Sequence, residues 1–416
     1  MGGSVTSTLG YTAVYMDGAD SIVPDYDYLS PTVMGRVTLT AKPALDFGVN
    51  MDFRMSYPYS ASSSFLKSAN YISTPITTVV TTSGTVTVPS ISVWALYSKF
   101  SVGDRLYMSF GKQPMAWGVA RGFFQPADNI FAESAVDYSD YSAEREGPLA
   151  FKAMYSVPKS MTNFYFLAGL PSSAASNPKL EDLRMAAKAE FNAGNTEFAF
   201  GAFYGYKDHP RVLAMATTGV GAFNLYGEAI GKYGSERYFL SKSGSVVSGA
   251  KESGQVYFSG TAGGYYTADD GDLTILAQYY YNGEGQEGVS AQDAYAYYYL
   301  GGNMSEFDNI SFATHNVGLL ISRAEFLNPD LTVALYAIAS LSDLSGFVVP
   351  SATWAFTDYF KVKLSATFNF GEAGDQYVLL GPDSTYIAHA GTPTSLFAKE
   401  PGVALSLLAT LGTGSF

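Results

Sequence analysis

The chain of 416 residues contains no cysteine. This absence excludes disulfide bonds, cysteine nucleophiles and metal sites with thiolate ligands. Charge is also scarce: 15% of the residues are charged, against about a quarter in an ordinary soluble domain. No apolar run of about 18 residues occurs anywhere, so the sequence excludes a transmembrane helix.

Two further features are missing from the sequence. The first residues, MGGSVTSTLGY, lack the basic start and apolar run of a secretory signal peptide. The chain is therefore expected to be either cytosolic or the mature form of an exported protein, and the strand pattern favours the mature form. The net charge of −13 argues against a nucleic-acid partner, because such partners bind basic surfaces.

What the sequence has instead is strict alternation of apolar and polar residues. Residues 46–57 read DFGVNMDFRMSY, which is typical of a strand with one apolar and one polar face. Segments of this kind recur to the end of the chain, and helical stripes do not. The pattern predicts eighteen strands, at 4–16, 33–45, 46–57, 88–102, 104–118, 147–158, 161–172, 182–193, 196–207, 210–220, 222–233, 254–267, 272–283, 311–324, 330–342, 346–358, 359–371 and 401–414.

The gaps between these strands alternate between short and long. The short gaps are rich in Gly, Asn, Asp and Pro, which tolerate tight turns. Most of the other gaps are long: 17–32, 58–87, 119–146, 234–253, 284–310 and 371–400. Long loops at one end and short turns at the other are typical of bacterial outer-membrane barrels. The predicted fold is therefore all-β, with residues 1–416 forming a single antiparallel up-and-down transmembrane barrel whose two termini lie on the short-turn side.

The two faces of the strands support a membrane barrel over a soluble sandwich. In 359–371 the apolar set includes Phe360, Leu364 and Phe368, whereas the polar set is mostly small and hydroxylic. A strand of about 11 residues, tilted by about 40°, spans the apolar band of such barrels, about 25 Å tall. Charge on the predicted lipid-facing sets is confined to Lys99, Lys112 and Arg323.

The predicted lumen wall is basic although the chain as a whole is acidic. Acids are fewer there, and many of the remaining acids lie in the outer loops. Rings of basic side chains favour anions, so the lumen is expected to favour anionic solutes, although pairing with the acids to hold the barrel in shape remains the alternative. The predicted pore-lining bases are Arg36, Arg54, Arg105, Lys152, Arg184, Lys188, Lys232, Lys361 and Lys363.

Barrels of 16 to 18 strands enclose an aqueous channel, so some other element must narrow this one. The third outer loop, 119–146, is long and mixes apolar with acidic residues. Folded inward, its acids would face the basic wall and create a transverse field. The predicted constriction residues are Arg121, Asp128, Glu133, Asp137, Asp140, Glu144 and Arg145.

Residues 111–131, GKQPMAWGVARGFFQPADNIF, resemble a strand-and-loop motif of Gram-negative outer-membrane barrels, including porin-like channels. The positions that match are Gly111, Gln113, Trp117, Gly118 and Asp128. The resemblance implies a passive channel or uptake barrel in the bacterial outer membrane, with membrane lipids and small solutes as partners. It leaves homotrimer and monomer open.

Catalytic groups do not converge in the sequence. The histidines His209, His315 and His389 are not at metal-ligand spacing, and no nucleophile elbow is present. We therefore expect no enzymatic activity, no metal and no cofactor. The main functional hypothesis is a porin for small hydrophilic solutes. The alternatives are an uptake barrel for hydrophobic substrates and a surface adhesin or structural barrel.

Overall fold

The structure is a computed structural model of the chain. It describes residues 2–15, 26–58, 78–81, 84–87, 90–134, 136, 144–174, 177–235, 237–244, 246–252, 254–268, 271–286, 288–291, 293–294, 297, 313–372, 375–378 and 402–412. No helix among these residues is long and apolar enough to cross a membrane.

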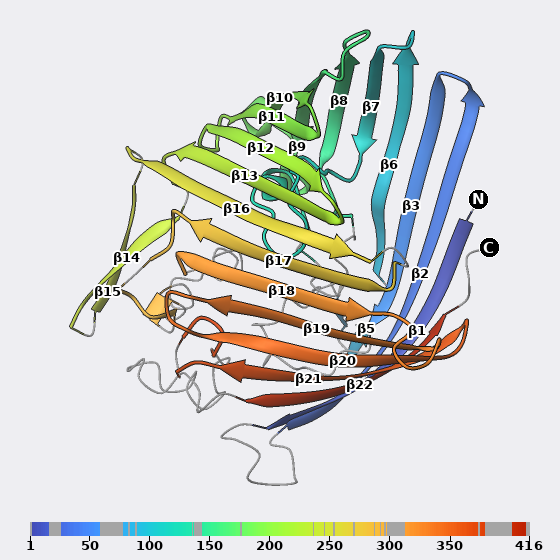
Figure 1. The fold of residues 1–416 in the computed structure, drawn as a ribbon, viewed down its shortest axis with the longest axis vertical. Helices are drawn as coiled ribbons and strands as arrows, with labels where there is room; N and C mark the ends of the chain where they lie inside the picture. The colour runs from blue at the N-terminus through green and yellow to red at the C-terminus, as the bar shows by residue number, and fades with distance from the viewer. Residues whose placement is uncertain are drawn as a thin grey trace.

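Eighteen antiparallel strands form one closed sheet (Figure 1). Each strand pairs with the next along the wall, and β22 returns to pair with β1, where Thr6 lies opposite Gly412. The strands are β1 (Gly2–Tyr15), β2 (Tyr26–Ala44), β3 (Phe47–Pro58), β6 (Ser90–Val102), β7 (Leu106–Lys112), β8 (Leu149–Ser156), β9 (Asn163–Leu170), β10 (Arg184–Ala193), β11 (Thr196–Gly205), β12 (Arg211–Val220), β13 (Phe223–Tyr233), β16 (Val256–Thr267), β17 (Leu273–Asn282), β18 (His315–Arg323), β19 (Leu331–Ser340), β20 (Gly346–Thr357), β21 (Phe360–Phe370) and β22 (Val403–Gly412).

The predicted fold class is confirmed: the chain is a closed antiparallel barrel of eighteen strands, and each predicted strand corresponds to one strand of the wall. The two ends of the chain lie together at the short-turn end (Figure 1). Glycines at that end supply the backbone geometry that tight turns need, as at Gly103 (φ 58°) and Gly194 (φ 63°).

Two predicted strand boundaries differ most from the structure. The strand predicted at 104–118 ends at Lys112, because Gly111 takes a φ of 133° and the chain then leaves the wall. The strand predicted at 33–45 begins earlier, at Tyr26, because β1 and β2 stay paired out to Val14 opposite Tyr26. Alternation alone did not reveal either change, since both depend on contacts with distant residues.

The outer surface of the wall is apolar. On β21, Phe360, Leu364, Phe368 and Phe370 are between 36% and 57% exposed. On the facing set of β22, Leu405, Leu407 and Leu411 are between 41% and 59% exposed. Exposed apolar side chains on successive strands make a continuous apolar wall, which is stable against lipid but not against water.

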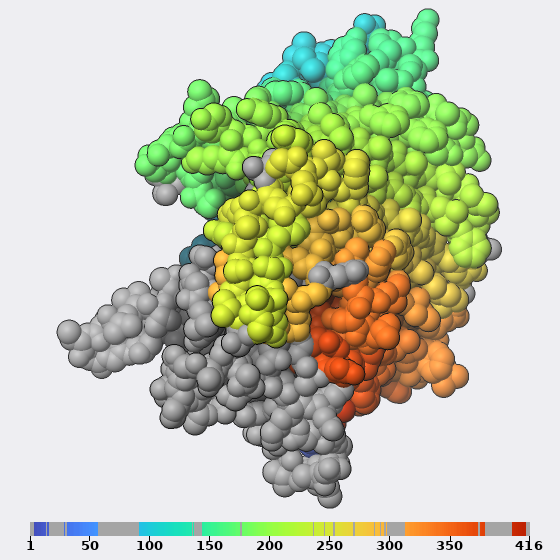
Figure 2. All heavy atoms as spheres, turned by 90° about the vertical axis from the view of Figure 1, so that its left-hand side faces the viewer, coloured from blue at the N-terminus to red at the C-terminus, as the bar shows by residue number. Residues whose placement is uncertain are grey.

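Short elements cover the long-loop end. The β4–β5 hairpin (Thr78–Thr81 and Gly84–Thr87) lies within the gap predicted at 58–87. A second hairpin, β14–β15 (Tyr238–Ser243 and Val246–Lys251), packs on the connection after β17 through Leu240, Val289 and Ala294. Figure 2 looks onto this end of the molecule, with the lime and yellow atoms of β14–β15 near its centre.

Candidate functional site

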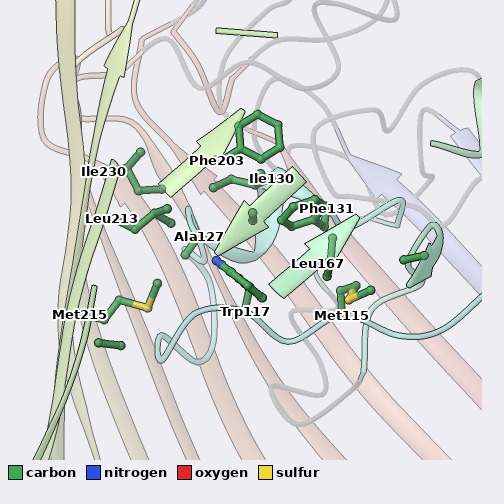
Figure 3. Close-up of a cluster of buried hydrophobic side chains, with 13 residues drawn as sticks. Met115, Trp117, Ala127, Ile130, Phe131, Leu167, Phe203, Leu213, Met215 and Ile230 are labelled. Atoms are coloured by element: carbon green, nitrogen blue, oxygen red, sulfur yellow. The ribbon is translucent and has the colours of Figure 1, made fainter. Parts of the chain in front are cut away.

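The segment after β7 enters the barrel and lies against its inner wall. We call residues 113–134 the inner segment. Trp117 and Phe131 of this segment are 1% and 2% exposed, and they pack on wall residues such as Leu167 and Phe203 (Figure 3). Phe131 meets Phe203 edge to face, with ring centroids 5.4 Å apart. This patch of the lumen wall is therefore apolar because it receives the inner segment.

A second apolar contact lies further around the wall. Phe123 packs on Leu276, Leu320 and other buried residues of β17 to β20. A Cβ on Gly318 would lie 2.3 Å from the Phe123 ring, so the absence of a side chain at Gly318 makes room for it. Phe124 stacks on Tyr280 at 5.1 Å between ring centroids. The inner segment is thus anchored along the wall from β8 to β20.

Backbone hydrogen bonds to Glu228 fix the path of the inner segment. Glu228 points inward from β13 and is 4% exposed. Its Oε2 accepts the backbone N–H groups of Val119 and Ala120, each at 3.1 Å, and its Oε1 accepts that of Ala127 at 2.9 Å. Gly118 is needed beside it, because a Cβ there would lie 2.4 Å from Glu228 Oε2. Three donors thus satisfy a buried carboxylate that burial alone would penalise.

Gln278 on β17 likewise holds the backbone of the inner segment, at Phe123 and Phe124. Its Oε1 accepts the backbone N–H groups of Phe123 and Phe124 at 3.0 Å and 2.9 Å, and its Nε2 donates to the Phe124 carbonyl at 2.7 Å. Nearby, Tyr226 donates its hydroxyl to the Arg121 carbonyl at 2.8 Å. Arg121 itself is exposed, with its guanidinium 5.7 Å from the centre of the Tyr265 ring.

Asp128 is buried within the inner segment and does not project toward the bases of the lumen wall. This differs from the expectation of a transverse field. Asp128 is 7% exposed, and its Oδ1 accepts the backbone N–H groups of Trp117 at 2.5 Å and Gly118 at 2.7 Å. Burial raises the pKa of Asp128, and the Gly118 and Trp117 N–H groups oppose this shift. Asp128 therefore closes a turn within the inner segment.

The later residues of the predicted constriction loop bind one another and a neighbouring connection. Glu133 Oε1 accepts the backbone N–H of Ser172 at 2.6 Å. Arg145 donates to the Ser134 carbonyl and to Asn129 Oδ1. Glu144 is exposed. Asp137 and Asp140 lie outside the described residues.

Lys112, which the alternation placed on the lipid-facing side, forms an ion pair with Glu146 at 2.5 Å. The pair lies where β7 ends and the connection returns to β8, so the charge of Lys112 is neutralised at the strand end.

Several predicted pore-lining bases are neutralised in the wall. Lys188 is 8% exposed, lies 2.7 Å from Glu190 and donates to the Trp117 carbonyl at 2.9 Å. Lys232 is equally buried and lies 2.6 Å from Glu284. Arg184 pairs with Asp208 at 2.9 Å, and Arg105 is exposed in the β6–β7 turn.

Four of the remaining bases lie on the part of the wall that the described inner segment does not contact, and the fifth, Lys152, lies on β8. Arg36 on β2 lies opposite Arg54 on β3, and Asp52 lies 2.7 Å and 3.6 Å from them. Lys361 and Lys363 project from β21 on the set opposite to the exposed Leu364. The inward residues between these bases are largely hydroxylic: Thr367, Ser406, Thr410, Thr8, Thr12, Thr32 and Thr38. We call the inward face of β21, β22, β1, β2 and β3 the basic wall.

Lys99 is a lumen residue that the alternation missed. The β3–β6 register shifts between Asp52 and Phe53, where Trp94 is the extra residue of a bulge. Beyond the bulge Lys99 lies opposite Ser109, which is 8% exposed and faces inward. The only sequence signal is the apolar run Val93 to Leu96, which breaks the alternation.

Comparison with known proteins adds little to this architecture. No family model and no curated protein matches the chain. Among solved structures, a mutant of the Rh. blastica porin aligns at 12% identity with a TM-score of 0.43, covering 99% of this chain and 100% of that chain. A triple mutant of the Rhodopseudomonas blastica porin aligns at 11% identity with a TM-score of 0.41, covering 98% and 100%. The functional argument therefore rests on the barrel itself, since a closed barrel of this size with an apolar outer face is an outer-membrane architecture.

Proposed function

We propose that the protein is an outer-membrane channel for passive diffusion of small hydrophilic solutes, with a preference for anionic ones. The observation that carries the proposal is the basic wall. Arg36, Arg54, Lys361 and Lys363 project from it, and Asp52 lies between Arg36 and Arg54. Hydroxyl groups around these bases suit a hydrated path, and fixed positive charge raises the local concentration of anions.

In this proposal the inner segment narrows the lumen from the opposite side. Its apolar side chains are buried against β8 to β20, and Glu228 and Gln278 hold its backbone. A segment held at so many points excludes part of the lumen without closing on the basic wall. We therefore place the solute path between the inner segment and the basic wall, and we infer that selectivity comes from the wall.

The test is single-channel conductance in a planar bilayer, with the reversal potential measured under a salt gradient. We expect an open channel whose reversal potential has the sign of an anion-selective pore. Lys361→Glu should move it toward cations, whereas Lys159→Glu, in the exposed β8–β9 turn, should leave it unchanged. A reversal potential that leans toward cations in the unmodified protein would overturn the anion preference, and no conductance would favour an uptake barrel or an adhesin.

A further inference from the structure

We propose that Lys99 and Lys152 form a binding site for a small oxyanion or carboxylate solute on the lumen wall between β6 and β8. The inference rests on the proposed diffusion function and deepens it, because it assigns a place where an anionic solute pauses inside the channel. We call these two residues the lysine site. The site lies beside the basic wall, on the next strands around the barrel (Figure 1).

The register places the two lysines in one row across three strands. Lys99 on β6 lies opposite Ser109 on β7, and Ser109 lies opposite Lys152 on β8. Directly opposite residues project to the same face, so both side chains point into the lumen. Neighbouring strands are about 4.8 Å apart, which puts the two Cα atoms about 10 Å apart. A lysine ammonium extends about 6 Å from its Cα, so both can reach one small anion above Ser109.

The residues around this row leave room for a ligand. Ser109 has a small side chain, and its hydroxyl donates to Gln113 Oε1 at 2.5 Å. On the other side of Lys99, the opposite residue on β3 is Gly48, which has no side chain. Ser109 and Gly48 therefore place neither a bulky side chain nor a negative charge beside the two lysines.

Several other lumen bases have a carboxylate partner, whereas the described residues supply none to the lysine site. Arg36, Arg184 and Lys232 each form an ion pair with an acid. Within the part of the chain that the structure describes, neither Lys99 nor Lys152 does so. Glu190 acts electrostatically on Lys152, but it forms its ion pair with Lys188, at 2.7 Å.

Aromatic rings take the place of carboxylates at the lysine site. The Lys99 ammonium lies 5.2 Å from the centre of the Tyr97 ring, and the Lys152 ammonium lies 5.7 Å from that of Tyr165. A ring face attracts a cation only weakly where water has access, whereas an anion bridging two ammonium groups gains charge-assisted hydrogen bonds from both. The pair of unneutralised cations in one row therefore favours a doubly charged or bidentate anion.

The experiment is block of the chloride current through single channels by inorganic phosphate, with succinate as a second probe. We expect each probe to reduce the chloride current of the unmodified protein saturably. Lys99→Gln and Lys152→Gln should each raise the half-blocking concentration about three- to tenfold, the loss expected for one charge-assisted hydrogen bond in a hydrated site.

Lys361→Gln is the matched control, because it removes one lumen lysine from the basic wall, away from the row of Lys99 and Lys152. It should shift the reversal potential and raise the half-blocking concentration clearly less than Lys99→Gln and Lys152→Gln do. Equal shifts in the half-blocking concentration for all three variants would overturn the lysine site and leave only general lumen charge.

Failure of the site and failure of the proposed function give different results. An open, anion-leaning channel in which phosphate and succinate cause no saturable block would overturn the site alone. An unmodified protein without conductance, or with a cation-leaning reversal potential, would overturn both. The chloride conductance of each variant shows whether it has folded and inserted.

Discussion

Glu228 and Ala127 lie 101 residues apart in the chain, yet the Glu228 Oε1 accepts the Ala127 backbone N–H at 2.9 Å. Glu228 also accepts the backbone N–H groups of Val119 and Ala120. It therefore joins strand β13 to two stretches of the inner segment that are seven residues apart, at Ala120 and Ala127. One inward carboxylate therefore determines where the inner segment lies in the lumen. The consequences are testable by substitution of Glu228.

Glu228→Gln should loosen the inner segment. The amide nitrogen cannot accept a hydrogen bond, so at least one buried N–H of the segment loses its partner, at a cost of about 1–3 kcal/mol. We expect faster hydrogen exchange in 117–127 and noisier single-channel currents. Glu197→Gln, which removes an inward acid from β11 without a bond to the inner segment, is the control. Equal exchange rates in the two variants would contradict the role given to Glu228.

Trp117→Ala should release the inner segment from the wall. Trp117 is 1% exposed and lies 5.8 Å from Phe131 between ring centroids, and removal of a buried tryptophan costs about 3–5 kcal/mol. We expect a lower thermal midpoint in detergent and a larger single-channel conductance. Trp354→Ala, which removes a ring that is 39% exposed on the outer surface, should leave the conductance unchanged. A conductance that stays the same in Trp117→Ala would argue against the inner segment as the constriction.

Leu364→Lys and Ser365→Lys should have opposite outcomes although the residues are neighbours. Leu364 is 57% exposed on the apolar outer surface, where a lysine costs about 2–4 kcal/mol at the middle of the bilayer. Ser365 faces the lumen, where a lysine meets water. Insertion into lipid vesicles and the free energy of unfolding from them should fall only for Leu364→Lys. Equal insertion of both variants would contradict the assignment of the two faces.

The buried pair Lys232 and Glu284 should make stability depend on pH. Burial raises the pKa of Glu284, but the nearby cations Arg237 and Lys232 outweigh it, and the net pKa lies below the ordinary value of 4.5. Because the folded-state pKa is depressed, the stabilisation is complete above the ordinary glutamate pKa and is lost as the pH falls through the depressed value.

The variant Glu284→Gln isolates this effect. It removes the Glu284 carboxylate from beside the buried Lys232, and breaking a buried ion pair in this way costs about 3–5 kcal/mol at neutral pH. The difference in thermal midpoint between the unmodified protein and the variant should therefore shrink between about pH 7 and about pH 3. Glu325→Gln, in an exposed turn, should show no difference at either pH. A difference for Glu284→Gln that is constant with pH would contradict the pairing.

The sequence by itself determined the number and order of the strands, the closed barrel, the two faces and the common end of the two termini. Alternation with a period of two is local, and an outer face against lipid requires it in every strand. Turn residues such as Gly103 and Gly194 mark the short-turn end for the same local reason. The matching motif residues Trp117, Gly118 and Asp128 also turned out to lie together, in the inner segment.

The tertiary structure alone decided what lies in the lumen. The path of the inner segment depends on Glu228 and Gln278, which are far away in the chain, and no local pattern encodes such a contact. Lys188 and Lys232 are bases in the predicted lumen set, and both are neutralised. Glu190 lies two residues from Lys188 on the same strand, whereas only the fold brings Glu284 beside Lys232. Lys99 points inward because one extra residue at Trp94 reverses the alternation, and a bulge of one residue is fixed by pairing with the next strand rather than by the strand's own sequence.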